Sequence, residues 1–172
     1  CADLRAVPMH GSLDYVTCLF DSLNFLLTEQ DLHAGIAQLA GALRPRGILY
    51  FDVVTERMVL DHFAGQEWTE RNNGVTSTWS CEYDRNTQTA ATSIRVNTGE
   101  VHTLRERMYP LELVYDAVER AGCQILGAYD AQTWRRPGRK TVRVDIVAVR
   151  GDANVYKRRF RNVQGFVQKM LK

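Results

Sequence analysis

The chain has 172 residues, 45% of them apolar, and a formal net charge of +2. This length and composition predict one folded domain and exclude an intrinsically disordered chain. No apolar run approaches the roughly 18 residues needed to span a bilayer, and no secretory signal pattern is present at the start, so we expect no membrane span.

The positive charge is concentrated at the end of the chain. Residues 151–172 contain six lysines and arginines against the single acid Asp152, so this tail carries +5 and residues 1–150 carry −3. Nucleic acid is therefore not an expected partner of the main part of the chain. A weaker hypothesis is a basic tail that recruits RNA, but no interleaving of basic and aromatic residues before the tail supports it.

The four cysteines form no C-x-x-C pair, and most of them lie in apolar, strand-like surroundings: Cys1, Cys18, Cys81 and Cys123. This setting is typical of reduced, buried thiols in a cytoplasmic protein. We therefore predict no metal site, and a zinc or disulfide role is the weaker alternative.

The apolar run from Tyr15 to Phe20 is too short for a typical helix and is rich in aromatic and β-branched residues. It predicts a strand buried on both faces. Asp21, Ser22 and Asn24 follow directly, at the strand end where open α/β sheets bind their ligands. We therefore expect a functional site there.

A helix and a second strand come next. Asp31 can cap a helix over 31–43, because apolar residues recur there at helical spacing and Arg-Pro-Arg-Gly at 44–47 ends it. The apolar run 48–54 predicts the second strand. Strand, helix and strand form one βαβ unit, whose right-handed crossover makes the two strands parallel neighbours.

After a short helix over 55–63, the sequence changes character. From 66 to 108 it is rich in Thr, Ser and Asn, and turn residues separate β-branched runs about every eight to twelve positions. This pattern predicts an antiparallel meander of hairpins, laid over one end of the larger sheet.

The last third predicts a helix, two strands and a final helix. Pro110 begins a helix whose apolar stripe ends before Gly122, and 123–129 and 141–149 are strand-like. Residues 151–172 predict a basic amphipathic helix. Packing on its own domain is the preferred interpretation, and binding to a membrane surface or a partner is the alternative.

Four pieces of this sequence resemble class I S-adenosylmethionine-dependent methyltransferases that act on small molecules. They are the segment from Cys1 to Pro8, the run from Asp14 to Leu27, the Arg-Pro-Arg-Gly turn and the acidic end of the strand at Asp52. They occur in the family's order over the first fifty or so residues, and looser similarity continues to about Arg150. The resemblance implies an α/β fold with a partial Rossmann-like sheet over 1–150, into which the meander is inserted as a lid.

The resemblance also implies S-adenosylmethionine as cofactor and a set of contacts to it. Asp3 and Leu4 would hold the adenine, and the backbone at Leu19 and Phe20 would meet the methionine amine. Asp21 would lie beside the cationic end of the cofactor.

The acceptor side is assigned in the same way. Ser22 and Asn24 lie nearer a small-molecule acceptor, and Trp68, Trp79 and Tyr83 suit the wall of a lid. Each of these aromatic residues fits a core between two sheets at least as well.

Methyl transfer needs little more than alignment of two reactants, with removal of a proton from the nucleophile where required. The candidate general bases are His10, His102 and Tyr109. Each of them fits a structural role better than a catalytic one.

One departure from the family pattern is large. The family's glycine-rich loop and the acidic end of its second strand have no counterpart, since no Gly-x-Gly occurs in the chain. The chain therefore corresponds to the second half of such an enzyme. Cys1 in place of an initiator Met suggests that a further segment precedes it. Without the missing contacts we expect weak or no binding of S-adenosylmethionine.

The missing half also affects the strand Tyr15–Phe20, which is central in the family. Here it would expose an unpaired edge that has none of the charges or prolines that block pairing. We expect this edge to be covered by a segment absent from this sequence or, if the chain is complete, by a symmetric homodimer.

Two hypotheses follow. The first is a methyltransferase of a small-molecule acceptor, present here entire or as a fragment. The second is a noncatalytic α/β module for binding or assembly that has lost the cofactor half. A glycine-rich strand–turn–helix upstream of Cys1 would favour the first.

Overall fold

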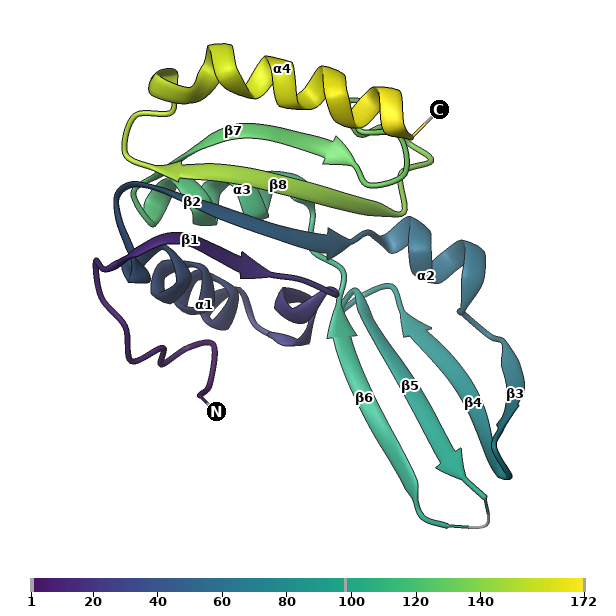
Figure 1. Ribbon diagram of the computed structural model, residues 1–172. Helices are drawn as coiled ribbons and strands as arrows, with labels where there is room; N and C mark the ends of the chain where they lie inside the picture. The colour runs from purple at the N-terminus through teal and green to yellow at the C-terminus, as the bar shows by residue number, and fades with distance from the viewer. Residues whose placement is uncertain (1, 98, 172) are drawn as a thin grey trace.

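The computed structural model describes residues 2–97 and 99–171, and the prediction made for Cys1 lies outside them. The described chain folds into two four-stranded sheets, four α-helices and one 3₁₀ turn (Figure 1). In chain order these elements are β1 (Leu13–Cys18), η1 (Ser22–Phe25), α1 (Glu29–Ala42), β2 (Leu43–Val54), α2 (Glu56–His62), β3 (Glu67–Asn72), β4 (Val75–Asp84), β5 (Thr89–Val96), β6 (Val101–Arg107), α3 (Leu111–Arg120), β7 (Cys123–Asp130), β8 (Arg143–Arg150) and α4 (Asn154–Met170).

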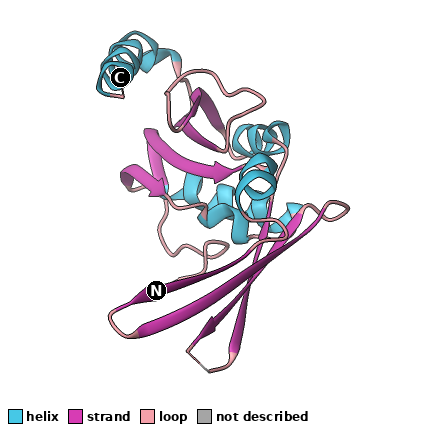
Figure 2. Ribbon diagram, turned by 90° about the vertical axis from the view of Figure 1, so that its right-hand side faces the viewer, coloured by secondary structure: helices cyan, strands magenta, loops and turns pink. Residues whose placement is uncertain are grey.

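The first sheet has the strand order β1-β2-β8-β7. β1 and β2 are parallel, and the pairs β2–β8 and β7–β8 are antiparallel. The predicted βαβ unit and the antiparallel final pair are therefore confirmed. Helices α1 and α3 cover one face of this sheet (Figure 2), where Phe51, Ile36 and Val114 are fully buried in the core.

The helix α1 begins earlier than predicted. Its N-cap is Thr28, whose Oγ1 accepts a hydrogen bond from the backbone N–H of Asp31 at 3.0 Å. Asp31 is thus the third residue of the first turn, where an acid is favoured by the helix dipole, and its prediction as the cap was wrong. Residues 44–47 do not separate α1 from β2, because they form an irregular start of β2 in which Arg46 has φ +67°.

The prediction that the first strand is buried on both faces was wrong. β1 ends at Cys18 and lies at the edge of the first sheet, with β2 as its only neighbour among the described strands. Val16 and Cys18 pack against the core, whereas Tyr15, on the opposite face, is 54% exposed. β1 therefore has one face packed against the core and one face exposed.

The second sheet is the predicted meander. It has the order β3-β4-β5-β6, all antiparallel, and it projects from the end of the first sheet (Figure 1). α2 lies at the junction, and a small cluster of buried residues joins the two sheets: Val54, Val59, Cys81, Ala90 and Met108. The buried hydrophobic cluster of the second sheet therefore lies at the end nearest the first sheet.

The final helix α4 packs with one side on β7. Phe160 lies 6.0 Å from Tyr129 and 6.1 Å from Trp134 between ring centroids, and the Gln168 side chain donates to the Trp134 carbonyl at 2.7 Å. Packing of the tail on its own domain is thus confirmed for this side, while Phe166 on another side is 63% exposed. Among the described residues, no helix is long and apolar enough to cross a membrane.

Candidate functional site

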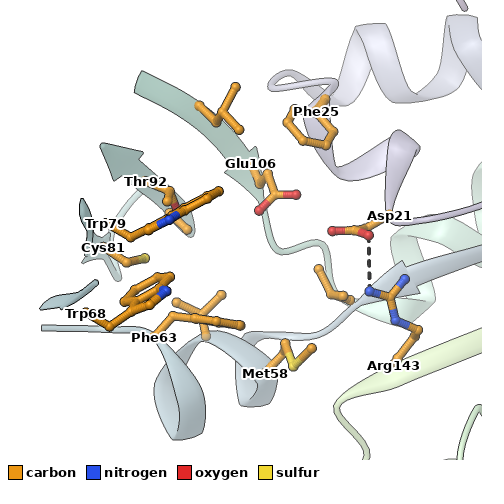
Figure 3. A pocket seen from close by; sticks show the side chains of 14 residues that line it. Asp21, Phe25, Met58, Phe63, Trp68, Trp79, Cys81, Thr92, Glu106 and Arg143 are labelled. Carbon is orange, nitrogen blue, oxygen red and sulfur yellow. Dashed lines mark hydrogen bonds and ion pairs between the residues drawn. The ribbon is translucent and has the colours of Figure 1, made fainter. Parts of the chain in front are cut away.

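A cavity of about 230 Å³ lies where the two sheets meet (Figure 3). Its lining comes from the loop after β1, from the end of β2, from α2, from all four strands of the second sheet and from Arg143 at the start of β8. Its volume lies just below the roughly 300–1,000 Å³ of most ligand pockets, so the cavity fits only a small molecule.

One wall of the cavity is aromatic. Trp68 of β3 and Trp79 of β4 are directly paired across the strands, and their rings stack at 5.8 Å between centroids and 11° between planes. Phe63, after α2, lies 5.7 Å from Trp68. This wall arises from antiparallel pairing, because side chains opposite each other on paired strands emerge on the same face.

The other side of the cavity carries charged groups at the ends of β1, β2 and β8. Arg143 donates to the carboxylate of Asp21 at 3.1 Å and also pairs with Asp52. The backbone N–H of Asp21 donates to Asp52 Oδ2 at 3.1 Å. Arg143 therefore holds the Asp21 side chain directly and the Asp21 backbone through Asp52, and its positive charge is shared between two carboxylates.

Glu106, near the end of β6, is the acidic residue that sequence reasoning missed. Its carboxyl group faces that of Asp21 across the top of the cavity (Figure 3). Burial, together with the neighbouring Asp21, raises the pKa of Glu106 to about 7. The available signal was alternation, because Leu104, Glu106 and Met108 share one face of an extended chain that turns toward the first sheet.

The loop after β1 has an unusual backbone. Phe20 and Asp21 have φ of +58° and +51°, so two consecutive non-glycine residues are left-handed. Such a conformation costs free energy and clusters at functional sites. It leaves Phe20 82% exposed and turns the Asp21 side chain into the cavity. The Ser22 hydroxyl donates to the Leu19 carbonyl at 2.7 Å and stabilises this turn.

The N-terminal segment lies beside this end of the sheet. Arg5 pairs with Asp3 at 2.7 Å and with Asp31, in the first turn of α1, at 3.0 Å. Hydrogen bonds from Arg5 lower the pKa of Asp3 to about 2, so Asp3 is ionised at neutral pH. The side chain of Leu4 packs against the first core.

Two of the candidate residues are used to hold the two sheets together. Asn24 is completely buried, its Nδ2 donates to the carbonyls of Arg107 at 2.8 Å and Val54 at 3.2 Å, and its Oδ1 accepts from the Val54 N–H at 3.0 Å. The Tyr109 hydroxyl contacts the carbonyls of Leu26 and Thr28, and burial raises the pKa of Tyr109 to about 12. Neither side chain lines the cavity.

The remaining candidates lie elsewhere. Tyr83 donates to Glu56 at 3.1 Å, outside the cavity. His10 in the N-terminal segment and His102 in β6 are exposed, and neither lines the cavity. Of the predicted site residues, the structure thus brings together Asp21, Trp68 and Trp79 around one cavity.

Comparison with known proteins gives a consistent result for the fold. No family model matches this chain. It is 25% identical over 131 residues to "Putative methyltransferase YqeM" of Bacillus subtilis (strain 168). This alignment covers 72% of this chain and 53% of that protein.

Solved structures extend the comparison. An S-adenosylmethionine-dependent methyltransferase from Clostridium acetobutylicum ATCC 824 aligns with a TM-score of 0.77 at 18% identity, over 88% of this chain and 64% of that one. CalS10, an amino pentose methyltransferase from Micromonospora echinaspora solved with S-adenosylmethionine bound, aligns with a TM-score of 0.63 at 23% identity, over 87% of this chain and 63% of that one. The sugar N-methyltransferase KedS8 from Streptoalloteichus sp ATCC 53650 aligns with a TM-score of 0.64 at 18% identity, over 88% of this chain and 61% of that one.

The chain therefore has the Rossmann-like fold of S-adenosylmethionine-dependent methyltransferases, as its sequence predicted. It spans between about half and two thirds of the length of these relatives.

Proposed function

We propose that this chain is the acceptor-binding part of an S-adenosylmethionine-dependent methyltransferase, and that a small molecule occupies the cavity between the two sheets. One observation carries the proposal. Asp21 belongs both to the strained loop that the resemblance assigns to the cofactor and to the lining of the cavity. A methyl donor at the loop and an acceptor in the cavity would therefore be neighbours.

The residues of the loop fit the amino acid part of the cofactor. The carboxylate of Asp21 can accept from a cation, and Leu19 and Phe20 are exposed residues beside it. Asp3 and Leu4 would hold the adenine, since the Asp3 side chain is 48% exposed and ionised. When bound, S-adenosylmethionine supplies a methyl group on a positively charged sulfur. The chain's own residues position the acceptor and exclude water from it.

The substrates named for two of the similar proteins also support a small-molecule acceptor. CalS10 is an amino pentose methyltransferase and KedS8 a sugar N-methyltransferase, so small molecules with a ring are acceptors on this fold. Their alignments cover nearly nine tenths of this chain and so extend over at least part of the second sheet. A small-molecule acceptor is thus more consistent with the cavity than a macromolecule.

The cofactor part can be tested by nuclear magnetic resonance on the ¹⁵N-labelled chain. We expect S-adenosylmethionine to shift the amide signals of Leu4 and residues 19–21 with a Kd near or above about 1 mM, because the glycine-rich loop is absent. Adenosine should shift only the Leu4 region. If millimolar S-adenosylmethionine leaves residues 19–21 unchanged, the cofactor assignment fails, and the noncatalytic binding or assembly module becomes the better description.

A further inference from the structure

The cavity contains two carboxyl groups in unequal surroundings. Asp21 is paired with Arg143 at 3.1 Å, and Arg143 also pairs with Asp52. Among the described residues, the ion pairs at the cavity involve these two acids but not Glu106. The charged lining residues Asp21, Glu106 and Arg143 therefore carry a net charge of −1 whenever Glu106 is ionised, so the cavity lacks one positive charge.

A bound cation would complete this arrangement. It would face Glu106 and Asp21 directly, whereas a carboxylate or phosphate would meet two acids and an Arg143 that is already engaged. A neutral hydroxyl would gain a hydrogen bond but would leave the charge of Glu106 uncompensated. The charges at the cavity thus favour an ammonium over a neutral or anionic group.

The opposite wall suits a ring that carries such a cation. Trp68 and Trp79 present stacked aromatic rings to the cavity, and Phe63 and Met58 add apolar surface (Figure 3). Tryptophan is the best aromatic partner for a cation, and aromatic faces also pack on apolar rings. A small ring with an amine can therefore contact both walls at once.

We propose that the acceptor is a primary or secondary amine on a small ring, held with its ammonium at Glu106 and its ring against the Trp68–Trp79 wall, and that Glu106 removes one proton from the nitrogen. This inference rests on the proposed function and names the substrate class of the same site. In the proton transfer, one N–H bond breaks and one Glu106 O–H bond forms. The electron pair stays on nitrogen, and the amine becomes a nucleophile.

The protonation of Glu106 suits this role. A primary alkylamine has a pKa of about 10.4, as lysine does, so it enters as the ammonium. A general base is most effective when its pKa lies near the working pH, and the pKa of Glu106 is raised to about 7. The charged groups near it are Asp21 from the loop after β1 and Arg143 from β8, and the Cys81 thiol of β4 is the other titratable group in its surroundings.

The inference can be tested without the cofactor. Cyclohexylamine, cyclohexanol and cyclohexanecarboxylate are probes with one ring and three different charges. Their binding can be followed through the indole N–H signals of Trp68 and Trp79, with Trp134 under α4 as an internal control outside the cavity. We expect the amine to bind at least about tenfold more tightly than the alcohol at pH 8, and the carboxylate not to bind.

The variant Glu106→Gln tests whether Glu106 causes the preference for the amine. In the wild type, amine affinity should rise about tenfold from pH 5.5 to pH 8 as Glu106 ionises, while in Glu106→Gln it should be lower at pH 8 and independent of pH. Glu82→Gln, at an exposed site of β4, should behave as the wild type. An unchanged Trp134 signal shows that each variant is folded.

Three outcomes would overturn the inference: equal binding of amine and alcohol, preference for the carboxylate, or amine binding that Glu106→Gln leaves unaltered. If none of the probes binds while S-adenosylmethionine still shifts residues 19–21, the amine assignment fails and the proposed function stands. If the amine binds as expected but S-adenosylmethionine shifts nothing, the failure belongs to the proposed function instead.

Discussion

The two sheets of this chain are stabilised in different ways. The first sheet packs α1 and α3 on one face and contributes to a cluster of 19 buried residues, whereas the cluster at the base of the second sheet has five. Strand β3 is almost entirely exposed and β6 largely so. The first sheet therefore supplies most of the hydrophobic stability, while the second supplies most of the cavity wall. A surface with few packing constraints is free to vary with the ligand that it binds.

A matched pair of leucines tests this comparison with the largest expected effect. Leu49 in β2 is completely buried, and Leu104 in β6 is 45% exposed. Leu49→Ala should lower the free energy of unfolding by about 3 kcal/mol, because it leaves a cavity in the core. Leu104→Ala should cost less than about 1 kcal/mol. Urea unfolding measures both, and equal losses would contradict the division between the sheets.

The second prediction concerns the junction. Asn24→Ala removes three hydrogen bonds that tie the loop after β1 to Val54 and Arg107 and leaves their backbone groups unpaired. We expect a loss of about 2–3 kcal/mol and faster hydrogen exchange at the Val54 amide. Asn162→Ala, on the exposed side of α4, should stay within about 0.5 kcal/mol of the wild type. A similar loss in both variants would rule out a special role for Asn24.

The third prediction concerns the contribution of Glu106, in the cavity, to the pH dependence of the chain's stability. The pKa of Glu106 is raised in the folded state from its usual value of 4.5 to about 7, so the folded state binds this proton more tightly than the unfolded one. Its contribution to stability is therefore fully present below about pH 4.5 and is lost as the pH rises through 7.

Glu106→Gln removes this dependence. The variant should be about 1 kcal/mol more stable than the wild type at pH 8, after allowance for partial solvent screening, and the difference should shrink toward pH 5. Glu82→Gln is the exposed control on the same sheet. Urea unfolding at the two pH values measures the effect, and a constant difference between Glu106→Gln and the wild type would show that Glu106 titrates normally.

Local sequence patterns predicted much of the fold. The parallel pair β1–β2, the helix between them and the antiparallel meander follow from periodicity and turn residues over short windows, and all are present. The cap of α1 was misplaced by three residues because Thr28 and Asp31 both suit a first turn. The exposure of β1 was missed because an apolar run does not reveal how many neighbours its strand has.

The candidate site was predicted in part. Trp68 and Trp79 of the predicted lid line the cavity, and so does Asp21, which lies three residues after β1, where the strand pattern located it. Glu106 lies 85 positions later, and its place opposite Asp21 depends on the orientation of the second sheet. Asn24 was interpreted as an acceptor contact and Tyr109 only as a weak candidate base. Their backbone partners lie 30 to 83 positions away, beyond the reach of local patterns.

The edge of the first sheet carries the last prediction, with the smallest expected effect on folding. β1 has one strand neighbour among the described residues, and Lys on an edge strand discourages pairing with another chain. Val16 packs against the core, so the variant belongs at Tyr15, which is 54% exposed. We expect the wild-type chain to form a homodimer through this edge as its concentration rises. Tyr15→Lys should remain monomeric, with a free energy of unfolding within about 0.5 kcal/mol of the wild type. Sedimentation equilibrium separates the two cases, and a wild-type chain that stays monomeric up to about 1 mM would exclude the dimer.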